Sequence, residues 1–192
     1  MGFGDNLRSK SALAANRRDM DVGRLGLELV ETVHNAETEI IVYLFVDADA
    51  RLDERGRRRL IIAVRGTDSQ QNLMSDVTCW SSSITLPHAL RLSEHGLLEL
   101  MVQSKVHTGF WAAYRSVREK LLAAVQRQST IFGGKLHIYA TGHSMGGAVA
   151  VLSLLESAIV LRKEQPGLTL YNFGAPLVGN LSFRNMYALP PH

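Results

Sequence analysis

The stretch HIYATGHSMGGAVAVLSLL, residues 137–155, constrains the fold of this chain more than any other part of the sequence. The apolar and β-branched residues at its start predict a buried strand, and the apolar run after Gly146 predicts a helix. Between them, Gly142-x-Ser144-x-Gly146 predicts a turn so sharp that only small residues fit two positions on either side of the serine. Such a turn exposes the serine hydroxyl, where it can act as a nucleophile.

The rest of the chain predicts strands and helices in alternation. Apolar runs predict four strands, at residues 39–46, 59–66, 135–141 and 168–174. Apolar spacing predicts helices over 109–127 and 146–161, and it is also roughly helical over 18–34. Alternating strands and helices predict an α/β fold with a mainly parallel sheet and helices on both of its faces.

Three polar or glycine-containing turns follow the ends of predicted strands. Arg65-Gly66-Thr67 follows one strand, Ser144 follows another, and residues 173–176 follow a third. Parallel sheets bind ligands beyond the carboxyl ends of their strands, so these turns are expected to meet at one edge.

A serine at such an edge needs further groups before it can transfer an acyl group. A histidine must accept its proton, and an acid must orient that histidine. Two N–H donors must also stabilise the oxyanion, and the Met145 backbone and Thr67 are candidates for them. From the residues alone, a plain glycine-rich turn at Ser144 and a Thr67 hydroxyl that caps its own loop are the alternatives.

Four segments together resemble the class 3 lipases, the fungal-type branch of the α/β-hydrolases. These are AVRGTDSQQNLMSDV (63–77), VHTGFWAAYRSV (106–117), YATGHSMGGAVAVL (139–152) and LYNFGAPLVGNLSF (170–183), and their order and spacing resemble those of that family. The resemblance implies an N-terminal extension over 1–38 and a partial lipase domain over 39–192. It also implies hydrolysis of lipid carboxylic esters, such as those of tri-, di- or monoacylglycerols, through an acyl-serine intermediate.

The resemblance assigns roles to individual residues. Ser144 matches the nucleophile, Thr67 and Met145 match the oxyanion donors, and Gly142 and Gly146 match the glycines of the turn. Residues 68–81 match a lid that covers the site in water, followed by an insert over about 82–104. The apolar face of the lid would consist of Leu73, Met74, Val77 and Trp80, for which packing in the core is the alternative.

The expected histidine and acid are not found after Ser144. Only 48 residues follow it, with no aspartate, and His192 is the only histidine among them. Glu156 would lie about 18 Å along the helix from Ser144, too far to orient a base there. The chain is therefore expected to be a fragment without the C-terminal strands and helix of the domain, and to have little or no turnover by itself.

Composition and residue spacing bear on the partners, cofactors and location to be expected for this chain. The net charge is +3, and acidic residues offset the basic run at 55–59, which is predicted as a solvated hairpin tip, so no nucleic-acid partner is expected. No metal-ligand spacing occurs, and no cofactor is expected. The first residues lack the apolar core of a signal peptide, no segment is apolar enough to span a membrane, and a single cysteine slightly favours the cytoplasm.

The predicted partner is a lipid ester at a lipid–water interface, which allows peripheral contact with a membrane. Two alternatives are a non-catalytic, lipase-like binding or signalling module, and another acyl-ester or thioester hydrolase on the same fold.

Overall fold

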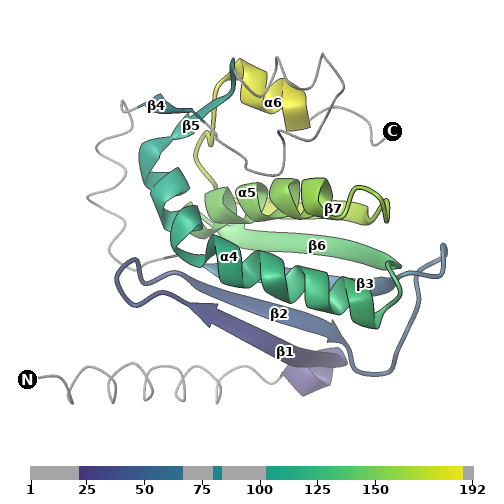
Figure 1. Ribbon diagram of the computed structural model, residues 1–192. Helices are drawn as coiled ribbons and strands as arrows, with labels where there is room; N and C mark the ends of the chain where they lie inside the picture. Colours follow the sequence, from purple (N-terminus) through teal and green to yellow (C-terminus); the bar gives the residue numbers. More distant parts are fainter. Residues whose placement is uncertain (1–21, 67–79, 84–102, 188–192) are drawn as a thin grey trace, which may run out of the picture.

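A five-stranded mixed sheet with two long helices on one face forms the body of the computed structural model (Figure 1). The structure describes residues 22–66, 80–83 and 103–187. Its elements in chain order are η1 (Val22–Leu25), β1 (Leu27–His34), β2 (Ile41–Asp47), β3 (Arg58–Arg65), β4 (Trp80–Ser83), β5 (Lys105–His107), α4 (Thr108–Ile131), β6 (Leu136–His143), α5 (Met145–Val160), β7 (Gly167–Phe173) and α6 (Leu181–Tyr187).

The strand order in the main sheet is β1-β2-β3-β6-β7. The β1–β2 and β2–β3 pairs are antiparallel, whereas β3–β6 and β6–β7 are parallel. Gly142 pairs with Val64 on one side and with Asn172 on the other. The carboxyl ends of β3, β6 and β7 therefore share one edge of the sheet, as the sequence predicts.

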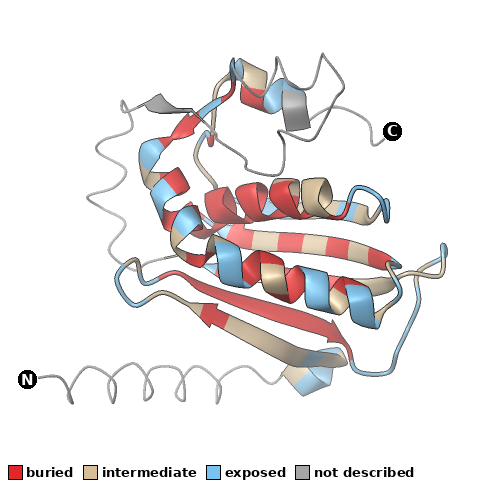
Figure 2. Ribbon diagram, in the orientation of Figure 1, coloured by how far each residue is buried: buried red, intermediate tan, exposed pale blue. Residues whose placement is uncertain are grey.

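The core lies between the sheet and the helices α4 and α5. The inward residues of β2, β3 and β6 are apolar and buried, and they pack against buried residues of both helices (Figure 2). α5 is buried along most of its length, which explains why its sequence is largely apolar. Within the described residues, both long helices lie on this face, and on the opposite face the short helix η1 packs through Val22 against Ile41, Tyr43 and Phe45.

Polar contacts inside this core fix α4 against α5. The carboxylate of Glu156 on α5 is 1% exposed and accepts hydrogen bonds from the Tyr114 hydroxyl and the Arg118 guanidinium on α4. Burial, followed by the Glu156 charge, raises the pKa of Tyr114 well above its usual value. Hydrogen bonding to Glu156 raises the pKa of Arg118. Glu156 is thus a structural residue, in agreement with its distance from Ser144.

The four strands and two helices predicted from apolar runs are confirmed within a few residues. The helical interpretation of residues 18–34 is wrong for residues 27–34, which form the edge strand β1. Only the first part of the basic run at 55–59 lies at the turn between β2 and β3, because Arg58 and Arg59 begin β3. Arg55 is exposed there, but Arg57 and Arg59 form ion pairs with Asp53 and Asp47.

None of the helices in the described ranges combines the length and the apolar character that a membrane span requires.

Candidate active site

Ser144 lies between β6 and α5 in a backbone conformation that side chains rarely adopt. Its φ is 54° and its ψ is −123°, and α5 begins at the next residue. A non-glycine residue in such a conformation stores about 1–3 kcal/mol of strain, which the surrounding structure must hold in place. Strain of this kind is common at active sites. Ser144 therefore lies on the sharp strand-to-helix turn that the sequence predicts.

The glycines around Ser144 are required by close backbone contacts. A Cβ atom on Gly142 would lie 2.4 Å from the carbonyl carbon of Gly146. On Gly146 it would lie 2.6 Å from the Val64 oxygen, and on Gly147 it would lie 2.6 Å from Oδ1 of Asn172. Real Cβ atoms essentially never come this close to other heavy atoms, so the turn and both neighbouring strands leave room for hydrogen only.

The strand β7 holds the turn from the other side. The Ser144 N–H donates to the Phe173 carbonyl at 2.9 Å. Oδ1 of Asn172, which lies against Gly147, accepts the N–H of Ala175 at 3.1 Å. Asn172 thus joins the segment after β7 to the start of α5. Sequence reasoning does not single out Asn172, and its only signal is an asparagine at the end of a strand, where asparagine is unfavourable.

Of the two predicted oxyanion donors, Met145 lies within the described residues and Thr67 does not. Met145 is buried and begins α5. Thr67 lies outside the described residues, but its neighbour Gly66 contributes a backbone nitrogen 2.8 Å from the position of a Cβ on Gly146. The end of β3 therefore reaches the turn that carries Ser144.

Of the four residues predicted on the apolar face of the lid, Trp80 alone belongs to the described part of the chain. Leu73, Met74 and Val77 lie outside the described residues, as does most of the predicted insert. Trp80 is the first residue of β4, where its backbone pairs with His107 of β5. His107 itself is buried and caps α4, because its Nδ1 accepts the N–H of Gly109 at 3.2 Å.

No side chain of residues 22–66 or 103–185 hydrogen-bonds to the Ser144 hydroxyl. Within the same part of the chain, no three His, Cys, Asp or Glu side chains are grouped as a metal site would need.

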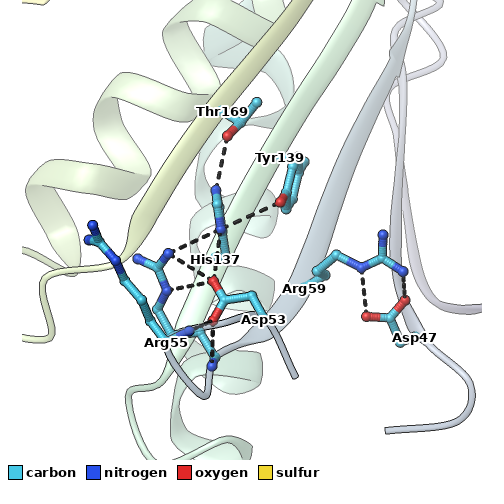
Figure 3. A network of polar contacts seen from close by, with 8 residues as sticks. Asp47, Asp53, Arg55, Arg59, His137, Tyr139 and Thr169 are labelled. Atoms are coloured by element: carbon cyan, nitrogen blue, oxygen red, sulfur yellow. Dashed lines mark hydrogen bonds and ion pairs between the residues drawn. The ribbon is translucent and has the colours of Figure 1, made fainter. Parts of the chain in front are cut away.

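One histidine does contact an acid and a hydroxyl, at the opposite edge of the sheet (Figure 3). Nδ1 of His137 lies 3.1 Å from Oδ2 of Asp53, and its Nε2 lies 2.9 Å from Oγ1 of Thr169. His137 is close to the start of β6, about 23 Å along the strand from Ser144. It therefore cannot act on Ser144, and it fixes the turn between β2 and β3 to β6 and β7.

Comparisons with known proteins agree with this geometry. Residues 61–190 match the family model described as lipase (class 3). The chain is 31% identical to the phospholipase A1 EG1 (chloroplastic/mitochondrial) of Oryza sativa subsp. indica over 151 residues, which are 75% of this chain and 34% of that protein. It is 28% identical to the secreted mono- and diacylglycerol lipase 1 of Fusarium solani over 165 residues, which are 86% of this chain and 42% of that protein.

A solved structure is similar as well. It is described as a triacylglycerol lipase whose catalytic centre is formed by a serine protease triad. The TM-score is 0.62 at 28% identity, over 84% of this chain and 53% of that one. This chain thus spans well under half the length of the two relatives above, and about half of that structure. A family match over most of the chain, on a fold with a strained serine where three strands end, shows that the chain belongs to the class 3 lipase family.

Proposed function

We propose that this protein hydrolyses carboxylic esters of lipids and that Ser144 is its nucleophile. The observation that carries the proposal is the strained turn at Ser144, where the ends of β3, β6 and β7 meet in a chain of the class 3 lipase family. The site lies at the carboxyl ends of parallel strands, where α/β folds bind ligands.

The reaction follows from the chemistry of a serine at this position. Oγ of Ser144 attacks the ester carbonyl carbon, and its proton passes to a histidine base, which the 48 residues after Ser144 are not expected to supply. The carbonyl oxygen becomes an oxyanion, which the backbone N–H of Met145 and the donors of Thr67 stabilise. The alcohol then leaves with the proton, and water hydrolyses the acyl-serine to release the fatty acid. A carboxylate is expected to orient the histidine.

The substrate class is inferred from the relatives. One is named a phospholipase A1 and another a mono- and diacylglycerol lipase, so a carboxyl ester of a glycerolipid is the expected substrate. Residues 68–81 are proposed as a lid, with Leu73, Met74, Val77 and Trp80 on its apolar face and with its end joined to β5 through the pairing of Trp80 with His107. These residues would contact the lipid phase when the lid moves away from Ser144.

The experiment is to treat the folded chain with a fluorophosphonate probe and to map the modified residue by mass spectrometry. We expect the label on Ser144, acquired more slowly than by a serine with a histidine base beside it, and its loss in Ser144→Ala with no change in the thermal transition. A folded protein that takes up no label, or that is labelled equally after Ser144→Ala, would contradict the proposal.

A further inference from the structure

The surface around α6 exposes large apolar side chains beside the candidate active site. Leu177 is 78% exposed and Leu181 is 65% exposed. They flank residues 178–180, which follow the carboxyl end of β7 and lie along β5 (Figure 1). Single exposed leucines are ordinary, but two that flank one short ordered segment form a local apolar surface.

Several hydrogen bonds hold this segment firmly in place. The backbone N–H of Asn180 donates to the Lys105 carbonyl at 2.9 Å, and Oδ1 of Asn180 accepts the Lys105 N–H at 3.0 Å. The Asn180 amide also donates to the Gln103 carbonyl at 2.9 Å, and the Val178 carbonyl accepts the His107 N–H at 3.0 Å. The leucines are therefore presented from an ordered backbone, which reduces the entropy that a binding partner would have to remove.

Among the described residues of β5, α6 and the segment between β7 and α6, the charged side chains near the two leucines are basic. Arg184 is exposed and lies three residues after Leu181, on the same face of α6, while Phe183 is buried on the other face. Lys105 is also exposed, on the strand to which Asn180 is bonded. The segments that build this region, 103–118 and 165–187, contain no aspartate or glutamate.

An apolar surface whose described segments carry basic residues and no carboxylates is complementary to an anionic lipid layer. Leucines gain free energy when they enter the boundary between headgroups and acyl chains, and lysine or arginine near the surface is attracted to the lipid phosphates. We infer that Leu177, Leu181, Lys105 and Arg184, the α6 surface, dock this protein on anionic lipid. This inference rests on the proposed function, because docking on lipid would bring lipid esters to the edge of the sheet where Ser144 lies.

The test is cosedimentation of the chain with two kinds of vesicle, phosphatidylcholine alone and phosphatidylcholine mixed with phosphatidylglycerol. We expect stronger binding to the mixed vesicles. The change Leu177→Ser/Leu181→Ser should weaken that binding about tenfold or more. The change Lys105→Gln/Arg184→Gln should weaken it by about 30-fold and remove the preference for phosphatidylglycerol.

A matched control uses residues at the other edge of the sheet. Leu52 is 60% exposed in the turn after β2, and Lys163 is exposed after α5. Leu52→Ser/Lys163→Gln should bind the mixed vesicles as the unmodified chain does. Equal binding by the α6 variants and this control would overturn the inference. So would α6 changes that dissociate a dimer while vesicle binding persists, because the surface would then join two copies of the chain.

Labelling of Ser144 by the fluorophosphonate probe separates this inference from the proposed function. The α6 variants should keep their thermal transition and their labelling rate in the absence of vesicles, since all four changed residues are exposed and lie outside the turn at Ser144. Vesicle binding without labelling would contradict the proposed function and leave the α6 surface supported. Labelling of Ser144 without vesicle binding would support the proposed function and contradict the inference about the α6 surface.

Discussion

Ser144 keeps its unusual backbone only because its neighbours are fixed. Its N–H is bonded to β7, and the glycines on both sides permit contacts that any side chain would block. The geometry of the candidate nucleophile is thus a property of the residues around it as much as of the serine.

Adding one methyl group at the turn should disrupt it. Gly146→Ala would place a Cβ 2.6 Å from the Val64 oxygen, and backbone atoms cannot move aside cheaply. We expect the free energy of unfolding in urea to fall by about 3 kcal/mol, with loss of labelling at Ser144. Gly56→Ala is the control, because Gly56 has a positive φ but nothing within 4 Å of a Cβ. Gly56→Ala should lower the free energy of unfolding by about 1 kcal/mol. An equal decrease for Gly56→Ala and Gly146→Ala would show that the close contacts of Gly146 do not determine its effect.

The sequence predicts the turn at Ser144 but not the asparagines that hold the neighbouring segments in place. The spacing of Gly142, Ser144 and Gly146 is local, so the turn can be recognised from the residues alone. Asn172 and Asn180 act through contacts with segments that are distant in the chain, such as the bond from Asn180 to Gln103, 77 residues away. No local pattern reports such a contact, and therefore these two residues become visible only in the structure.

At the scale of elements, the buried contacts of Glu156 decide how α4 and α5 pack. Glu156→Ala should leave Arg118 buried without its partner and lower the free energy of unfolding by about 3–5 kcal/mol. Tyr114→Phe, which removes one hydrogen bond to a charged group, should cost about 1.5–3 kcal/mol. Both can be measured by urea unfolding at neutral pH.

Arg127→Gln is the matched control on α4, the helix that carries Tyr114 and Arg118. Arg127 pairs with Glu31 at 2.6 Å, but its side chain is 53% exposed. Such pairs contribute about 0–1 kcal/mol, so its loss should be small. A loss for Glu156→Ala no larger than for Arg127→Gln would show that the buried pair does not fix the helices.

The strand β1 shows why apolar spacing alone misleads. The register of β1 against β2 shifts between Leu29 and Glu31, so the alternation of inward and outward residues is interrupted. Leu29, Val30 and Val33 then fall at the spacing of a helix. β1 is also an edge strand whose residues are mostly half-buried, which weakens its apolar pattern further. By contrast, β2 is buried throughout and is evident as a continuous apolar run.

At the scale of the whole molecule, Asp53 should make stability depend on pH. Burial opposes its ionisation. Hydrogen bonds from the Arg57 backbone, His137 and the Arg57 guanidinium outweigh that effect and hold the pKa of Asp53 well below its ordinary value. Because the folded pKa is the lower one, the contribution of Asp53 is present above the unfolded pKa, about 3.9, and is lost as the pH falls.

The measurement compares the chain with Asp53→Asn by urea unfolding across a pH series. The unmodified chain should be more stable near neutral pH, and the difference should shrink below about pH 4 as Asp53 gains a proton in the unfolded state. A difference that stays constant down to acid unfolding would show that ionised Asp53 is not the stabilising form.

The turn between β2 and β3 lies at the opposite edge of the sheet from Ser144, about 25 Å away across the eight residues of a strand. A tether attached there, at the exposed Arg55, would orient every molecule on a sensor chip in the same way. The edge with Ser144 would face the solution, so vesicles or probes could be supplied to an immobilised protein without obstruction by its own support.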